Sequence, residues 1–264
     1  MQFHTFGCRN NKKLLLMHGM LCDWQKFYDL LKPLEKDYCL IFPAMDGCYD
    51  GAPDFVSFAD ECAQIEAYID REFGGSLDAV WGISQGATLM SELLARNRIR
   101  VKTAILDGIY LAHQGRWCAD FGLKTFTKMQ INGGEPTAPL RMICKLMGLD
   151  KSDMGELSLM YWGSSRKSMY SNLLENYTYH VNLDIAGSNT HIFLWCGSRE
   201  PYAIKSHNIL KKYLKHYEET IWPGMGHGKM IFSETEKYIL NISDTIEQDF
   251  SADRGKNTPG KETL

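Results

Sequence analysis

The 264-residue sequence predicts an α/β fold, in which a mostly parallel central sheet is covered by helices on both faces. Three observations support this prediction. Short runs that are apolar almost throughout alternate with longer segments whose apolar residues recur at helical spacing. Strands that are apolar on both sides are typical of a parallel sheet buried between two layers of helices. One interval of about 80 residues interrupts the alternation, and it is too long for a simple connection.

The amino-terminal part of the chain contains four apolar runs that predict buried strands. The first run closes at His18-Gly19, and the second is expected to stop at Pro43, since proline cannot donate a hydrogen bond to a neighbouring strand. The segment from Phe58 to Phe73 carries apolar residues at helical spacing and predicts a helix, as does the segment from Ala87 to Asn97. The four strand runs are Lys13–Met17, Tyr38–Phe42, Leu77–Gly82 and Thr103–Leu106.

The interval from residue 110 to residue 190 lacks a convincing buried strand, although it is rich in Met, Trp and Tyr and contains helix-like stretches. We interpret it as a mainly helical insertion lying over the sheet. The alternative is a second small domain with a role of its own. The predicted domain division is therefore a core made of residues 1–109 and 191–250, the insertion 110–190, and a tail 251–264.

The carboxyl-terminal part returns to the alternation of strand and helix. The runs His191–Cys196 and Thr220–Trp222 predict strands, and the segments Ala203–Tyr217 and Lys229–Ile246 predict helices. Residues 251–264 are polar and lack apolar periodicity, so we expect a flexible tail.

Composition and charge exclude several classes of protein. The chain is 44% hydrophobic and 23% charged, as is usual for a globular protein. A net charge of −3 gives no strong electrostatic case for binding nucleic acid or an anionic membrane. The amino terminus does not resemble a signal peptide, and no apolar run approaches the roughly 20 residues that span a bilayer. We therefore expect a cytoplasmic protein without a membrane span.

The cysteines give no sign of a metal site. The eight of them form neither a CxxC pair nor a Cys/His spacing typical of metal ligands. Without an export signal, reduced thiols are expected, and Cys39 and Cys196 lie inside apolar runs as small core residues. No nucleotide-binding fingerprint is present. We expect neither a metal nor a cofactor.

The sequence Gly82-Ile83-Ser84-Gln85-Gly86 places a serine between two glycines where a strand run gives way to a helix. A nucleophile elbow needs small residues two positions before and after the nucleophile, because larger side chains collide in so tight a turn. The serine hydroxyl would then project from the carboxyl edge of the sheet, where open α/β sheets bind ligands. The alternative is an ordinary turn between a strand and a helix.

A serine hydroxyl is inert unless a base removes its proton. Of the eight histidines, His227 stands out, because it lies in a glycine-rich loop between the last strand run and the last helix. That loop could carry the imidazole over the edge of the sheet. His191, His207 and His216 lie in strand or helix segments, where packing or exposure is the expected role. The alternative for His227 is a polar loop residue.

The base needs an acid that fixes its tautomer. Glu200 is the carboxylate in the loop that follows the His191–Cys196 strand run, and the order Ser84, Glu200, His227 is the order of serine, acid and histidine in this kind of fold. Asp107, at the end of the preceding strand, is the alternative acid. Glu200 could otherwise be a surface ion-pair partner of Arg199.

Two backbone N–H groups are expected to hold the developing oxyanion. The first belongs to Gln85, directly after the nucleophile, and the second to Met20 in the loop after the first strand, where Gly19 lets the backbone approach a substrate. His18 is expected to fix this loop, and Trp24 to be a packing residue.

At this point the sequence resembles the α/β-hydrolase superfamily. The matching pieces follow the order of the superfamily over about residues 3–248. They are Met17-His18-Gly19-Met20 with Trp24 downstream, Phe42-Pro43 with Asp46-Gly47, Gly82 to Gly86, Gly197 to Glu200, and Gly226-His227-Gly228.

The resemblance implies an α/β-hydrolase fold in which the insertion is a helical cap. The sequence departs from the superfamily at Glu200, where most relatives carry aspartate. Its amino end is also short, so the antiparallel strands that usually begin the sheet are expected to be reduced to Phe3–Phe6.

These residues predict a serine hydrolase that cleaves an ester or related acyl bond of a small, apolar or aromatic substrate through an acyl-enzyme at Ser84. The same residues could serve a thioesterase, amidase, lactonase or carbon–carbon bond hydrolase, or the chain could be a ligand-binding member of the fold without turnover. A haloalkane dehalogenase or epoxide hydrolase is not expected, since each would need aspartate at position 84.

The predicted partner is a small-molecule substrate. The Met and aromatic residues of the cap suggest an apolar pocket, with Trp117 and Trp162 as candidates for its wall. Many of these residues could instead form the cap's own core. The oligomeric state is left open.

Overall fold

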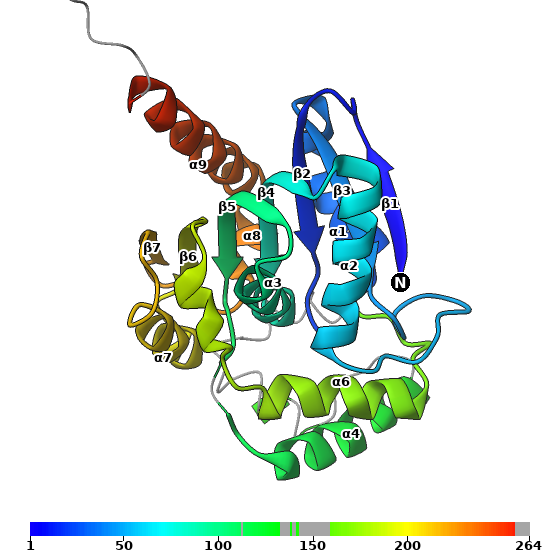
Figure 1. Ribbon diagram of the computed structural model, residues 1–264. Helices are drawn as coiled ribbons and strands as arrows, with labels where there is room; N and C mark the ends of the chain where they lie inside the picture. The colour runs from blue at the N-terminus through cyan, green and yellow to red at the C-terminus, as the bar shows by residue number, and fades with distance from the viewer. Residues whose placement is uncertain (112, 133–137, 139–140, 143–158, 257–264) are drawn as a thin grey trace, which may run out of the picture.

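A computed structural model of the chain describes residues 1–111, 113–132, 138, 141–142 and 159–256 (Figure 1). Its centre is a seven-stranded sheet with the order β1-β3-β2-β4-β5-β6-β7. Only the pairing of β1 with β3 is antiparallel, so the predicted mostly parallel sheet is confirmed. The strands are β1 (Gln2–Phe6), β2 (Lys12–Met17), β3 (Tyr38–Ala44), β4 (Ser76–Ile83), β5 (Arg100–Asp107), β6 (His191–Gly197) and β7 (Tyr217–Trp222).

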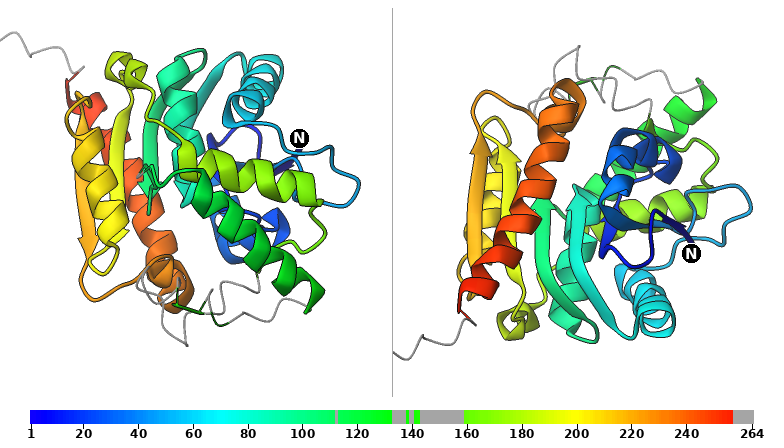
Figure 2. Two further views of the ribbon diagram at one scale, coloured as in Figure 1. Left: turned by 90° about the horizontal axis from the view of Figure 1, so that it is seen from below. Right: turned by 90° about the horizontal axis from the view of Figure 1, so that it is seen from above.

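Helices cover both faces of this sheet because its strands are apolar on both sides. Leu14 and Leu16 of β2 belong to one apolar cluster together with α1, α8 and α9, whereas Leu15 and Met17 belong to another with α2 and α3. Figure 2 shows α9 lying along the sheet. The helices are α1 (Trp24–Leu31), η1 (Lys32–Lys36), α2 (Phe58–Phe73), α3 (Gln85–Arg96), α4 (Arg116–Ile131), α6 (Arg166–Thr178), η3 (Leu183–Gly187), α7 (Pro201–Leu210), α8 (Lys229–Ser233) and α9 (Thr235–Lys256).

Pro43 does not stop its strand as predicted. β3 continues to Ala44, and Pro43 pairs with Phe3 of β1. The parallel pairing of β3 with β2 has already ended at Leu15 and Ile41. At Pro43 the strand therefore has a single neighbour, and the missing N–H of proline is tolerated. β1 is the short antiparallel strand that was expected at the amino end.

The predicted helix from Ala203 to Tyr217 is too long. α7 ends at Leu210, and Tyr217 begins β7. β7 is an edge strand with mostly exposed residues, so only its end, Thr220–Trp222, was recognised as a strand run, and its first residue was assigned to the helix.

Helix α1 was not predicted, although the sequence carries a signal for it. The side chain of Asp23 accepts a hydrogen bond from the backbone N–H of Gln25 and caps the helix. Trp24, Phe27 and Leu31 then follow at spacings of three and four and are buried. Trp24 has the packing role expected for it.

The carboxyl-terminal helix differs from the prediction at both ends. The predicted Lys229–Ile246 helix is divided into α8 and α9, and α9 continues to Lys256 through the first six residues of the predicted flexible tail. Residues beyond the core need not be apolar to remain helical, since a helix that has been nucleated propagates through ordinary polar residues. The rest of the predicted tail, residues 257–264, lies outside the described residues.

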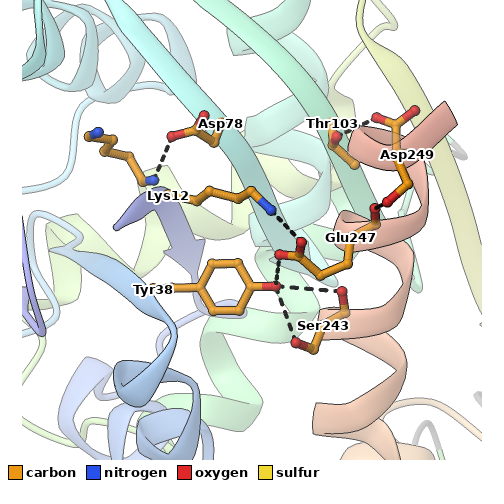
Figure 3. Close-up of polar contacts among 9 residues, drawn as sticks. Lys12, Tyr38, Asp78, Thr103, Ser243, Glu247 and Asp249 are labelled. Atoms are coloured by element: carbon orange, nitrogen blue, oxygen red, sulfur yellow. Dashed lines mark hydrogen bonds and ion pairs between the residues drawn. The ribbon is translucent and has the colours of Figure 1, made fainter. Parts of the chain in front are cut away.

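A buried tyrosine and two carboxylates attach α9 to the sheet (Figure 3). The hydroxyl of Tyr38 in β3 lies 3.1 Å from Ser243 Oγ and donates a hydrogen bond to Glu247 Oε1, also 3.1 Å away. Thr103 of β5 donates a hydrogen bond to Asp249 Oδ2 over 2.5 Å. Burial raises the pKa of Tyr38 to about 12, so the hydroxyl keeps its proton for this contact.

Replacing Tyr38 with phenylalanine is expected to lower the free energy of unfolding by about 0.5–1.5 kcal/mol. The change removes the hydroxyl, so Ser243 and Glu247 of α9 lose a hydrogen-bond partner. Chemical denaturation measures this value. The control is Tyr217→Phe, whose side chain is exposed on β7 and whose change should stay within about 0.5 kcal/mol. Equal stabilities of wild type and Tyr38→Phe would show that this contact does not hold α9.

The described part of the insertion is helical. Figures 1 and 2 show α4 and α6 side by side, beyond the end of the sheet toward which β5 runs. Phe126 and Met129 of α4, with Met169 and Leu173 of α6, are buried in the apolar cluster that also contains α2 and α3. The core on this face therefore continues into the insertion without interruption.

Two further expectations concern the cysteines and the membrane. The seven described cysteines are free, and Cys39 and Cys196 are fully buried, as expected for small core residues. In the part of the chain that the structure describes, no helix combines the length and the apolar character that a membrane crossing requires.

Candidate active site

Ser84 lies at the sharp turn between β4 and α3, with φ of 57° and ψ of −122°. A positive φ is unfavourable for a residue with a Cβ and persists only where the surroundings enforce it. A Cβ on Gly82 would lie 2.6 Å from the carbonyl oxygen of Gly86, and one on Gly86 would lie 2.4 Å from that of Met17. Neither glycine position can carry a side chain, as a nucleophile elbow requires.

His227 and Glu200 meet at the same end of the sheet. His227 lies in the loop between β7 and α8, and its Nδ1 is 2.5 Å from Glu200 Oε2. The other carboxylate oxygen of Glu200 accepts a hydrogen bond from the backbone N–H of Gly197, also over 2.5 Å. Both oxygens of this buried carboxylate are therefore engaged, and its direction is fixed. The carboxylate is turned toward His227 and not toward its sequence neighbour Arg199.

The turn at the end of β5 contacts both Ser84 and His227. The backbone N–H of Ser84 donates to the carbonyl oxygen of Asp107, 2.8 Å away. The next residue, Gly108, has φ of 59°, and a Cβ there would lie 2.7 Å from His227 Cε1 and 3.2 Å from Glu200 Oε2. Glycine at this position makes room for the imidazole. Sequence reasoning missed Gly108, although a glycine directly after a strand is a possible signal.

Asp107, the alternative acid, has a different partner. Tyr238 of α9 donates a hydrogen bond to Asp107 Oδ2 over 2.5 Å, and Trp81 Nε1 of β4 donates one to the Tyr238 oxygen over 3.0 Å. Burial, with the nearby Glu200 carboxylate, raises the pKa of Asp107 to about 7. The structure thus places Glu200 in contact with His227 and turns Asp107 toward α9.

The loop after β2 lies beside Ser84. A Cβ on Gly19 would be 3.6 Å from the Cβ of Ser84. His18 is buried, which lowers the pKa of its imidazole and so favours the neutral ring. Its Nδ1 is 2.9 Å from the carbonyl oxygen of Gly19, so a neutral ring with the proton on Nδ1 fixes the loop.

A segment of the insertion, around Leu159 and Tyr161, also fixes this loop. Leu21, in the loop beside Ser84, has φ of 54° and is a second strained residue. Its carbonyl oxygen accepts a hydrogen bond from the N–H of Tyr161, and the N–H of Asp23 donates to the carbonyl oxygen of Leu159, each over 2.8 Å. Met20, the expected oxyanion donor, is therefore carried by a loop that is fixed on both sides.

Gln85, the residue after Ser84, is attached to the insertion. The side chain of Gln85 is buried, and its Nε2 donates to the backbone oxygen and to Oδ1 of Asn172 in α6, over 3.2 Å and 2.9 Å. Sequence reasoning missed Asn172, since a polar residue on a helix carries no signal for a partner 87 positions away. The contact places α6 over the elbow.

A pocket opens beside the imidazole of His227. Two tyrosine rings on its wall, Tyr110 and Tyr202, lie with centroids 5.8 Å apart. Tyr202 is partly exposed, whereas Tyr110 is buried. The lining residues are Gly108, Tyr110, Glu200, Pro201, Tyr202, Ala203 and His227.

The tryptophans expected in the pocket wall do not line this pocket. The side chain of Trp117 is 69% exposed, and Trp162 is half-buried against the core. Met129 and Met160 are buried in the core, which agrees with the alternative that such residues are core residues and do not line a pocket. Met147 lies outside the described residues.

Solved structures share the fold of this chain, although no protein-family model and no curated protein matches its sequence. A protein described as an α/β-hydrolase family member, from Desulfitobacterium hafniense, superposes with a TM-score of 0.79 at 22% identity, over 92% of this chain and 99% of that one. MenH from S. aureus gives 0.74 at 13% identity, over 94% and 98%.

An esterase from Thermogutta terrifontis superposes with a TM-score of 0.72 at 12% identity, over 94% of this chain and 93% of that one. At identities this low, the superpositions establish the fold of the chain and nothing about its chemistry. Evidence for the chemistry comes from the site itself.

Proposed function

We propose that this chain, which has the α/β-hydrolase fold, is a serine hydrolase that cleaves a carboxylic ester through an acyl-enzyme. Ser84 is the nucleophile, His227 the general base and acid, and Glu200 the carboxylate that orients His227. The backbone N–H groups of Gln85 and Met20 hold the oxyanion. The observation that carries the proposal is the contact between His227 Nδ1 and Glu200 Oε2, at the same end of the sheet as a strained serine that follows β4.

The reaction follows from the position of the proton. With Nδ1–H directed at Glu200, Nε2 of a neutral His227 is free of a proton and accepts the one from Ser84 Oγ as that oxygen attacks the carbonyl carbon. The bond from carbon to the alcohol oxygen then breaks, and His227 returns the proton to the departing alcohol. Water repeats the two steps, releasing the acid and restoring Ser84.

The pocket beside His227 suggests which substrates fit. Because His227 protonates the leaving alcohol, a pocket next to its ring is suited to the alcohol part of an ester. Besides Gly108, Glu200 and His227, its walls are two tyrosine rings, a proline and an alanine, which favour a small aromatic or apolar group. Among the structural neighbours, an esterase and a lipase-esterase-related protein make an ester the first substrate to test.

Wild type is expected to prefer a benzyl ester over the cyclohexylmethyl ester of the same acid, because a flat ring stacks on Tyr202. Tyr202→Ala should reduce that preference in kcat/KM by about 2–10-fold, the scale of an aromatic pair. The ranking of acyl lengths should stay the same. Tyr217→Ala, on the exposed edge strand, is the control. If Tyr202→Ala leaves the preference for the benzyl ester unchanged, the alcohol part of the ester does not bind in the pocket beside His227.

The bond type is tested with p-nitrophenyl esters of increasing acyl length, alongside matched thioesters and amides. We expect ester hydrolysis that Ser84→Ala abolishes. Faster turnover of thioesters or amides would show that the chain is a thioesterase or an amidase that uses the same residues. No turnover, together with no labelling of Ser84 by a fluorophosphonate, would favour a ligand-binding protein.

A further inference from the structure

A buried chain of hydrogen bonds lies behind the Glu200–His227 pair. It runs from the indole N–H of Trp81 in β4 to the hydroxyl of Tyr238 in α9, and from that hydroxyl to Asp107 at the end of β5. All three side chains are buried. Asp107 directly precedes Gly108, the residue on which the His227 ring packs.

The groups that face Asp107 come from four elements around it. Glu200 at the start of α7 and the imidazole of His227 both interact with it electrostatically, and Tyr238 of α9 donates its hydrogen bond. The thiol of Cys196 in β6 also lies within electrostatic range. Two carboxyl groups therefore interact with the imidazole of His227: Glu200 by direct contact, and Asp107 electrostatically.

We propose that Asp107 is a positioning residue of the site, which acts through His227 by supplying a second negative charge that makes the imidazole more basic. This proposal deepens the proposed function and rests on His227 being its base. Tyr238 and Trp81 hold the carboxyl group in the interior and so keep the charge beside the imidazole.

The sign of the effect follows from Coulomb's law. An ionised Asp107 stabilises the imidazolium and raises the pKa of His227. Burial and Glu200 raise the pKa of Asp107 to about 7, so its charge is present above that pH and is lost below it. In the wild type, the loss of activity at acidic pH should therefore extend over two coupled protonation steps.

Asp107→Asn removes the charge and keeps the shape of the side chain. NMR titration of the imidazole protons should give a His227 pKa lower by roughly one unit than in wild type. The His227 signals are identified by their absence in His227→Ala. The acidic limb of kcat/KM should move in the same direction and become a single step.

Tyr238→Phe is the second variant, because it leaves Asp107 in place. It removes the hydrogen bond that favours the ionised carboxyl group, so Asp107 becomes a weaker acid and the His227 pKa should shift in the same direction by a smaller amount. The matched control is Glu61→Gln on α2, another buried carboxyl group, whose pKa is raised to about 8 by burial. It should leave the pKa of His227 unchanged.

An unchanged His227 pKa in a folded Asp107→Asn or Tyr238→Phe variant would overturn the proposal. A loss of stability with no change of pKa would do the same, since it would reduce the network to a structural role. The NMR titration needs no substrate, so it decides this proposal even if the chain turns over no ester, an outcome that would count against the proposed function alone.

Discussion

Replacing Ser84 with alanine is expected to lower kcat for ester hydrolysis by about 10⁶-fold, the scale of the loss in a comparable triad. Without the hydroxyl no acyl-enzyme can form, and His227 has no proton to accept. The fold should be retained, because the turn is enforced by the backbone contacts of Gly82 and Gly86 and not by the serine hydroxyl. Single-turnover kinetics and circular dichroism measure the two effects.

A second substitution at the same position separates chemistry from strain. Ser84→Gly should be equally inactive but more stable than Ser84→Ala by about 1 kcal/mol, since glycine adopts φ of 57° without a steric cost. Ester hydrolysis near the wild-type rate in either variant would remove Ser84 from its proposed role.

Replacing Glu200 with glutamine is expected to lower kcat by up to roughly 10⁴-fold, as an aspartate-to-asparagine change does in another triad. The amide can still accept the hydrogen bond from Gly197 through its oxygen. Its NH₂ group then faces His227 Nδ1 and forces the proton onto Nε2. The imidazole can no longer take a proton from Ser84, although the shape of the site is unchanged.

The comparison that decides the acid is with Asp107→Asn. This variant should lose much less activity, because Asp107 is hydrogen-bonded to Tyr238 and acts on His227 only at a distance. The two rates are compared at a pH well above 7, where the expected shift of the acidic limb does not contribute. If Asp107→Asn were the more damaging change, the carboxylate that orients His227 would be Asp107, at the end of β5.

Patterns local in sequence were enough to predict much of the fold. Runs such as Leu77–Gly82 are apolar because their strands are buried on both faces, and β4 duly covers Ser76–Ile83. The predicted bounds were wrong where a strand is not buried on both faces or where its pairing changes. β7 is an exposed edge strand, and Pro43 is tolerated because β3 has one neighbour there.

In the candidate site too, the features with a local sequence signal could be predicted and the others could not. The tight turn around Ser84 dictates its glycines, so the elbow could be recognised from five consecutive residues. Contacts between distant segments left no local pattern. Asn172 reaches Gln85 from the insertion, and the hydroxyl of Tyr238 in α9 donates its hydrogen bond to Asp107. Only the folded chain shows which carboxyl group meets His227.

The central claim, an activated nucleophile at Ser84, is tested most directly by labelling with a fluorophosphonate followed by peptide mass mapping. We expect one adduct per chain on the peptide that contains Ser84. Labelling should be slowed strongly in Glu200→Gln and His227→Ala and should be absent in Ser84→Ala. A folded wild-type protein that stays unlabelled, or one that is labelled at another residue with Ser84 untouched, would contradict it.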